Sequence, residues 1–185
     1  MNYEEKTLSR EEIYRGNIIK VSSLTVALPD GRTATRDVVA HPGASVILPL
    51  NERGEAYLVR QFRKPLESMS LELPAGKLDQ GEDPGVCAER ELKEETGLTA
   101  DSIKHVISIH TTPGFSDEVI HLYVATGLTE GDSCTDADEF LSTEKLPVGT
   151  LVDMVLKGEI TDAKSIIGIL LADRVIKGEI DLKSI

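Results

Sequence analysis

The sequence contains no tryptophan and only two cysteines, Cys87 and Cys134. Their spacing matches no metal-binding or redox motif, so we expect two free thiols in a reducing compartment. No apolar run approaches the roughly 18 residues needed to cross a bilayer. The charged start, MNYEEKTLSREE, has no apolar segment of the kind found in a signal peptide. These absences predict a cytoplasmic protein without a membrane partner.

Basic residues are also scarce, since 20 lysines and arginines stand against 32 acidic residues and the net charge is −12. Nucleic acid is therefore not expected as the main partner, because binding to its phosphates usually requires a basic patch. A small phosphorylated substrate stays compatible with this charge, because bound metal ions and a few arginines can reverse the field locally. The 40% of hydrophobic and 28% of charged residues are typical of a globular protein.

A helix is predicted between Asp83 and Gly97. Aspartate followed by proline is a common helix start, and glycine often ends a helix because it takes positive φ. Three glutamates crowd one face of this helix at positions i, i+3 and i+4, namely Glu91, Glu94 and Glu95. A hard divalent cation would reverse their mutual repulsion, because Mg²⁺ takes oxygen ligands. On their own, the three glutamates are equally compatible with a solvated acidic face.

The spacing around the helix separates these two interpretations. Nine residues match every fixed position of the Nudix box, G-x5-E-x7-R-E-U-x-E-E-x-G-U with U aliphatic: Gly76, Glu82, Arg90, Glu91, Leu92, Glu94, Glu95, Gly97 and Leu98. The sequence therefore resembles the Nudix hydrolases. The resemblance implies an α/β fold, built as an α/β/α sandwich around a mixed β-sheet on which the box helix packs.

The resemblance also implies a metal centre. Family members bind Mg²⁺, with Mn²⁺ as the alternative ion, through glutamates and one backbone carbonyl. The matching groups are Glu91, Glu95 and the carbonyl of Ala75, with Glu94 assisting. Arg90 would orient the glutamates through ion pairs. Such ions neutralise a diphosphate and lower the pKa of a bound water.

Further segments resemble the ADP-ribose pyrophosphatase branch of the family. Arg63, in RQFR, matches an arginine that binds substrate phosphate with its planar fork, and Glu72, in LELPAGK, matches a glutamate near the metals. Pro113, in PGFSDE, matches a proline that shapes the pocket wall beside the terminal ribose. Arg36, on a predicted N-terminal strand, matches a substrate contact donated across a dimer. The alternatives are an exposed or surface arginine for Arg36 and Arg63, and an ordinary Pro-Gly loop for Pro113.

The resemblance divides the chain into residues 1–42, a small N-terminal β subdomain exchanged in a homodimer, and residues 43–185, the Nudix hydrolase domain. The apolar patterns fit this order of elements. They predict strands at residues 18–28, 33–40, 44–50, 56–62, 102–111 and 118–126, and later helices at residues 150–157 and 163–177. Residues 1–16 are polar and mixed, and no element is predicted there.

An acidic loop at residues 127–138 matches the family loop that supplies the carboxylate for activating water. Glu139 is favoured because it directly precedes Phe140, while Asp136 and Asp138 are alternatives, as is a merely solvated loop. Farther on, KGEITDAKSI (157–166) nearly recurs as KGEIDLKSI (177–185). The step D-x-K-S within it resembles the start of the final helix in this branch.

The predicted function is hydrolysis of ADP-ribose to AMP and ribose 5-phosphate. A GDP-mannose or other nucleoside diphosphate sugar pyrophosphatase is the alternative within enzymes. A non-catalytic module that senses ADP-ribose is the alternative of another class, although such modules often lose box glutamates and every one is present here. Without tryptophan, adenine would have to stack on a side chain such as Tyr14, or on none.

Overall fold

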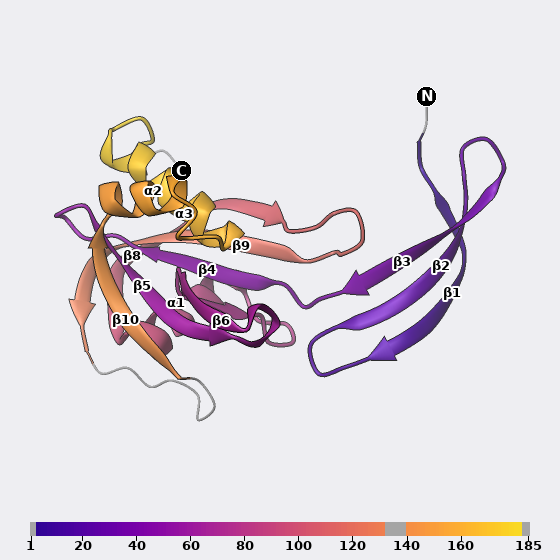
Figure 1. Ribbon diagram of the computed structural model, residues 1–185, viewed down its shortest axis with the longest axis horizontal. Helices are drawn as coiled ribbons and strands as arrows, with labels where there is room; N and C mark the ends of the chain where they lie inside the picture. Colours follow the sequence, from indigo (N-terminus) through magenta and orange to yellow (C-terminus); the bar gives the residue numbers. More distant parts are fainter. Residues whose placement is uncertain (1–2, 132–139, 183–185) are drawn as a thin grey trace. The chain divides into compact units, whose positions relative to one another are not determined.

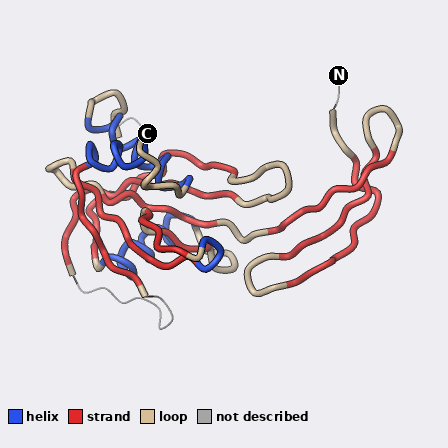
Figure 2. Tube along the Cα trace, in the orientation of Figure 1, coloured by secondary structure: helices blue, strands red, loops and turns tan. Residues whose placement is uncertain are grey.

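The computed structural model describes residues 3–131 and 140–182. The chain divides into two compact units. The first consists of Met1–Gly43 and His110–Val119, and the second of Ala44–Ile109 and Ile120–Ile185. Figures 1 and 2 trace the elements of both units. The predicted boundary between residues 42 and 43 stays a prediction.

The first unit contains an antiparallel sheet in the order β1-β2-β3. Its strands are β1 (Lys6–Arg15), β2 (Lys20–Ala27) and β3 (Thr33–Ala40). On β2, alternate side chains are buried, including Leu24 and Val26, and the turn to β3 contains Gly31 at φ 86°. The hairpin is thus formed where the alternating pattern predicts it. Strand β1 was missed because all ten of its residues are exposed, so it carries no apolar alternation.

A loop between two later strands joins this sheet. Val39 of β3 donates from its amide to the carbonyl of Phe115 over 2.7 Å and accepts from the amide of Asp117 over 3.2 Å. The amide of His41 donates to the Asp117 carboxylate over 2.9 Å. The PGFSDE segment is therefore attached to β3 within the first unit.

The second unit contains two sheets, in the orders β7-β4-β9-β8 and β10-β5-β6. The first sheet is mixed, because β4 runs parallel to β9 and antiparallel to β7. The predicted mixed sheet is confirmed. The strands are β4 (Ala44–Pro49), β5 (Glu55–Arg63), β6 (Ser68–Glu72), β7 (Ala75–Lys77), β8 (Leu98–His110), β9 (Val119–Glu130) and β10 (Leu141–Pro147).

Three α-helices lie in the described part of this unit: α1 (Pro84–Thr96), α2 (Val148–Leu156) and α3 (Ala163–Ile176). A short 3-10 helix, η1 (Lys64–Leu66), follows β5. The predicted caps of α1 are present, because the Asp83 carboxylate accepts from two backbone amides and Gly97 has φ 71°. Asp162 caps α3 in the same way, through the amide of Ser165.

Helices cover both faces of β4. Leu48 belongs to a core that includes Leu151 of α2 and Ile169 of α3, whereas Ile47 packs with Leu92 of α1. Figure 1 shows α2 and α3 above β4 and α1 below it. Successive side chains of a strand point to opposite faces, so an apolar run such as ASVILPL requires cover on both sides. The predicted α/β/α sandwich is confirmed.

Three short or polar strands were not predicted, namely β6, β7 and β10. Four of the seven residues of β10 are exposed, and β7 has only three residues, so neither shows a readable period. Pairing with neighbouring strands decides their conformation. None of the helices in residues 3–131 and 140–182 combines the length and apolarity that a membrane crossing requires.

Candidate active site

Two glutamates of α1 lie against the backbone of β7. Glu91 is 7% exposed and Glu95 is 2% exposed. The amide of Ala75 donates to Oε2 of Glu95 over 2.9 Å. A Cβ atom on Gly76 would lie 1.7 Å from Oε1 of Glu91. The box therefore begins with glycine because the carboxylate of Glu91 fills the space that a side chain would need.

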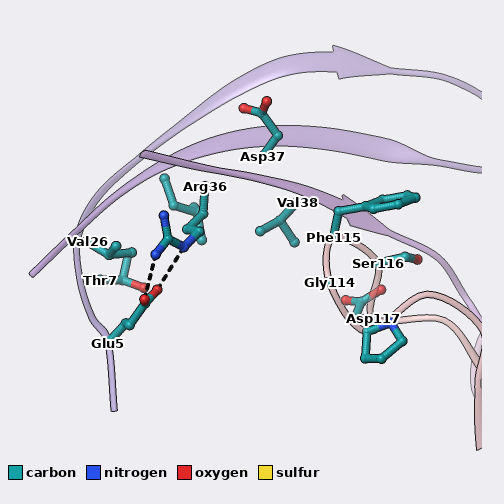
Figure 3. Close-up of a pocket in the computed structure, with 12 residues that line it drawn as sticks. Glu5, Thr7, Val26, Arg36, Asp37, Val38, Gly114, Phe115, Ser116 and Asp117 are labelled. Carbon is teal, nitrogen blue, oxygen red and sulfur yellow. Dashed lines mark hydrogen bonds and ion pairs between the residues drawn. The ribbon is translucent and has the colours of Figure 1, made fainter. Parts of the chain in front are cut away.

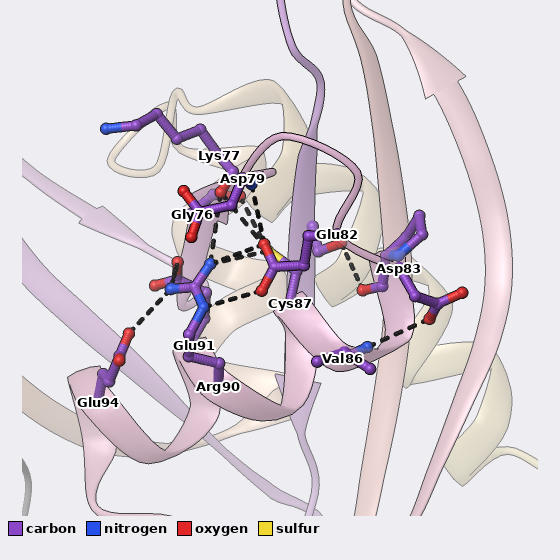
Figure 4. Close-up of polar contacts among 12 residues, drawn as sticks. Gly76, Lys77, Asp79, Glu82, Asp83, Val86, Cys87, Arg90, Glu91 and Glu94 are labelled. Carbon is purple, nitrogen blue, oxygen red and sulfur yellow. Dashed lines mark hydrogen bonds and ion pairs between the residues drawn. The ribbon is translucent and has the colours of Figure 1, made fainter.

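Arg90 connects the other acidic residues of the box (Figure 4). Its Nε and Nη2 donate to the two carboxylate oxygens of Glu82 over 3.0 and 3.1 Å. Its Nη1 donates to Oε1 of Glu91 over 2.6 Å and to Oε2 of Glu94 over 2.9 Å. The hydrogen bond from Arg90 holds the pKa of Glu82 at about 2, and the pairing with Glu82 raises the pKa of Arg90. Arg90 thus pairs with both Glu91 and Glu94, and its role in orienting them stays a prediction.

Cys87 lies beneath this network, fully buried on α1. Its Sγ is 3.7 Å from the carbonyl oxygens of both Gly76 and Lys77, and Nη2 of Arg90 donates to it over 3.4 Å. Burial raises the pKa of this thiol to about 11, so it stays protonated at neutral pH. Cys87 is a free cysteine, as predicted, while Cys134 lies outside the described residues.

Arg63, at the end of β5, is joined to Glu72, at the end of β6. Nε and Nη2 of Arg63 donate to the two oxygens of Glu72, each over 2.8 Å. Nζ of Lys164, on α3, also contacts Oε2 of Glu72. Burial alone would raise the pKa of Glu72, but the hydrogen bond from Arg63 and the charge of Lys164 outweigh it and hold this pKa at about 2. Sequence reasoning missed Lys164, although the D-x-K-S step contains it.

The start of α3 is attached to the residue that follows Glu72. The buried hydroxyl of Ser165 accepts from the amide of Leu73 over 2.7 Å and donates to Asp162 over 2.5 Å. A Cβ on Gly168 would lie 2.3 Å from Cδ1 of Leu73, so the helix approaches Leu73 closely. The carbonyl of Pro74 then accepts from the amide of Ile47 over 2.9 Å. Each of the residues 72–76 is thus contacted by α3, β4 or α1.

The groups around β7 fit a divalent cation. Hard cations take carboxylate and carbonyl oxygens, and Glu91 and Glu95 bring two buried carboxylates against the peptide groups of Ala75 and Gly76. Within residues 3–131 and 140–182, no group of three or more His, Cys, Asp or Glu side chains is arranged to hold a metal ion. A cation here would therefore need a backbone oxygen beside the carboxylates. The ligand set of Ala75, Glu91 and Glu95 stays a prediction.

The first unit has a pocket of about 430 Å³, and two other predicted residues, Arg36 and Pro113, are among those that line it. Figure 3 shows Arg36 in this pocket. Nη2 of Arg36 lies 2.6 Å from Oε1 of Glu5, and its Nε donates to Oε2 over 3.0 Å. Phe115, which is half exposed, also lines the pocket. Tyr14, the aromatic residue suggested for adenine, is not among the lining residues, whereas Phe115 is. Phe115 was not singled out because it stands in a loop without a periodic pattern.

The predicted loop carboxylates Asp136, Asp138 and Glu139 lie outside the described residues. Their assignment as the group that activates water stays a prediction. The described structure thus forms two groups of predicted residues. Arg63, Glu72 and the residues of the box lie in the second unit, and Arg36 and Pro113 lie in the first.

Both the sequence and the fold of this chain resemble those of known proteins. The NUDIX domain matches residues 39–166, and the nucleoside diphosphate sugar hydrolase N-terminal domain matches residues 5–39. A solved structure described as an ADP compounds hydrolase superposes with a TM-score of 0.83, covering 95% of this chain and 96% of its own. At 21% sequence identity, that similarity concerns the fold.

Curated relatives align over most of their length. A methanol dehydrogenase activator from Bacillus methanolicus is 41% identical over 90% of this chain and 91% of its own. An ADP-ribose pyrophosphatase from Bacillus subtilis is 40% identical over 88% of this chain and 89% of its own. An ADP-ribose pyrophosphatase from Mycobacterium tuberculosis is 35% identical over 95% of this chain and 86% of its own. With the domain match and the complete box, these similarities show that the chain belongs to the Nudix hydrolase family.

Proposed function

We propose that this protein hydrolyses the diphosphate bond of ADP-ribose to give AMP and ribose 5-phosphate. One observation carries the proposal, namely that two buried carboxylates, Glu91 and Glu95, lie against the Ala75–Gly76 backbone. Two relatives that are 40% and 35% identical are ADP-ribose pyrophosphatases, which supports the choice of substrate. In the reaction, the oxygen of a water molecule bonds to one phosphorus, and the bridging oxygen leaves with the other phosphate.

Nudix hydrolases in general use divalent metal ions, and we assign Mg²⁺ to this site, with Mn²⁺ as a substitute. Glu91, Glu95 and the carbonyl of Ala75 would hold the ion, with Glu94 assisting. A bound Mg²⁺ supplies charge that neutralises the diphosphate and lowers the pKa of water. Arg90 keeps two of these glutamates apart and oriented by pairing with them.

Other side chains bind the substrate and move the proton. The guanidinium of Arg63 would bind a phosphate oxygen, because Nε and Nη2 are engaged by Glu72 while Nη1 makes no hydrogen bond within the described part of the chain. Arg36 and Pro113, which line one pocket, would contact the nucleoside or the terminal ribose. Glu139, or Asp138 in its place, would accept the proton of the attacking water.

The assembly in this proposal is a homodimer in which residues 1–42 of each chain exchange and Arg36 serves the partner's site. The match of residues 5–39 to a domain characteristic of nucleoside diphosphate sugar hydrolases supports a separate N-terminal subdomain. Light scattering coupled to size-exclusion chromatography measures the mass of the assembly, and a mass of one chain would contradict it. A cytoplasmic location stays part of the proposal.

The same protein has one alternative substrate and one alternative function. Relatives from Yersinia enterocolitica and Cronobacter sakazakii, 30% and 33% identical, are GDP-mannose pyrophosphatases. They make GDP-mannose the alternative substrate, and the higher identity to ADP-ribose pyrophosphatases disfavours it. An ADP-ribose sensor without turnover is the alternative of another class, which the complete set of box glutamates disfavours.

The 41% identity to the methanol dehydrogenase activator favours a second candidate function, the activation of a dehydrogenase. Adding this protein to a methanol dehydrogenase and following NADH formation tests it. A rate unchanged by the addition would exclude this candidate for that dehydrogenase.

The deciding experiment measures phosphate release, coupled to alkaline phosphatase, from ADP-ribose, GDP-mannose, UDP-glucose and NADH. Each substrate is run with Mg²⁺ and with EDTA, for wild type and for Glu95→Gln. We expect turnover to be greatest on ADP-ribose, to stop in EDTA, and to fall by about 100-fold or more in the variant. Greatest turnover on GDP-mannose would refute the substrate, and tight ADP-ribose binding without any turnover would indicate a sensor.

A further inference from the structure

A lysine far from the box in sequence shares a buried carboxylate with the arginine proposed to bind phosphate. Lys164 stands at the second position of α3, and only 11% of its side chain is exposed. Its Nζ contacts Oε2 of Glu72 and lies 2.9 Å from Oδ2 of Asp162. Glu72 also accepts both hydrogen bonds from Arg63. Two cations and two carboxylates therefore balance each other in one cluster.

This balance affects how much positive charge Arg63 can offer to a ligand. A carboxylate shared by two cations compensates each of them only in part, and interactions between partly buried charges are weakly screened. Asp162 and Glu95 also act on Arg63, and both raise its pKa. Arg63 and the proposed metal ligand Glu95 contact the same short segment, because Arg63 binds Glu72 and Glu95 accepts from the amide of Ala75. Without Lys164, the whole negative charge of Glu72 would act on the positive charge of Arg63.

We propose that Lys164 is a positioning residue for the reaction. It acts through Glu72, so that Arg63 stays oriented and part of its positive charge remains available to the substrate diphosphate. This inference rests on the proposed function, and it adds a residue that the box and the branch motifs do not contain. Ser165 supports the same arrangement, since its hydroxyl fixes the amide of Leu73 directly after Glu72. The D-A-K-S step at residues 162–165 thus acquires a role in substrate binding.

The test compares Lys164→Met with Lys177→Met, a matched control. Lys177, at the end of the same helix, pairs with Asp173 on the surface, so its loss changes the net charge equally without touching Glu72. We expect K164M to raise KM for ADP-ribose about tenfold while kcat stays within about threefold. K177M should leave both constants unchanged, and Lys164→Arg should restore most of the loss. A lysine with only a structural role would lower the melting temperature without this separation of KM from kcat.

A second comparison shows whether Lys164 acts through Glu72. In a Glu72→Gln background the shared charge is absent, so adding K164M should change KM by less than about twofold. A further tenfold increase would mean direct contact with substrate and would overturn the positioning role. If K164M does not fold, Lys164→Gln is measured in its place, because glutamine keeps a hydrogen-bond donor towards Glu72. Its KM is expected to lie between the KM of wild type and that of E72Q/K164Q. Equal KM values for wild type, K164M and K177M would also overturn the inference, whereas an inactive wild type would refute the proposed function instead.

Discussion

Replacing Gly76 with alanine tests the geometry on which the proposed site depends. The new Cβ would lie 1.7 Å from Oε1 and 2.1 Å from Cδ of Glu91, whereas ordinary contact begins near 3.4 Å. The carboxylate would therefore have to retreat by about 1.7 Å, or β7 would have to shift away from α1. A misplacement of about 1 Å at a catalytic group can reduce the rate about 100-fold. We expect kcat of Gly76→Ala on ADP-ribose to fall at least that far.

The same substitution should also lower stability, because adding a methyl group to a packed site costs about 1–3 kcal/mol. For a chain of this size, each kcal/mol lowers the melting temperature by about 2–4 °C. Initial rates measured by coupled phosphate release give the first effect, and calorimetry gives the second. Gly149→Ala is the control, since a Cβ on Gly149 would meet nothing within 4 Å. Wild-type activity in Gly76→Ala would show that Glu91 need not occupy this position.

Three further outcomes follow from the contacts around Glu72 and the box. The pKa of Glu72 is lowered to about 2 from 4.5, so the stability that its charge contributes is present above pH 4.5 and is lost as the pH falls towards 2. The melting temperatures of wild type and Glu72→Gln should therefore converge over that range. A constant difference between them would contradict the lowered pKa. Ser165→Ala leaves the buried amide of Leu73 without its acceptor, so the free energy of unfolding measured in urea should fall by about 1–3 kcal/mol. Equal unfolding midpoints for wild type and the variant would refute this. Arg90→Lys cannot replace the four hydrogen bonds that the planar guanidinium makes to three carboxylates, because an ammonium has only three donors on one nitrogen, so kcat should fall about tenfold or more, and unchanged kcat would remove the orienting role.

Local chemistry made much of the second unit predictable. Asp83-Pro84 and Gly97 set the ends of α1 because an N-cap carboxylate and a positive φ act within one turn of the backbone. The helix α3 begins after Asp162 for the same reason. The apolar run of β4 indicated cover on both faces, and α1 and α3 supply it. At the two helix ends, neighbours in sequence carry the whole interaction, whereas the run in β4 indicates only that both faces need cover and not which helices provide it.

Strands stabilised by distant partners could not be predicted in this way. The residues of β1 are exposed throughout, and its conformation depends on pairing with β2. The strand β10 pairs with β5, whose partner residues lie 80 to 92 positions earlier in the chain. Polar side chains on exposed strands show no alternation between apolar and polar positions, so the sequence contains no signal for them.

The family, the acidic residues of the box and the helix that carries them could be recognised without coordinates, because a fixed spacing within one helix sets which side chains share a face. Three contacts became visible only in the folded chain: Glu91 lies against Gly76, Glu95 accepts a hydrogen bond from the amide of Ala75, and Arg63 shares Glu72 with Lys164. Glu72 and Lys164 are separated by 92 positions. Contacts over such separations depend on how strands and helices pack around the common core, and no local pattern of residues encodes that packing.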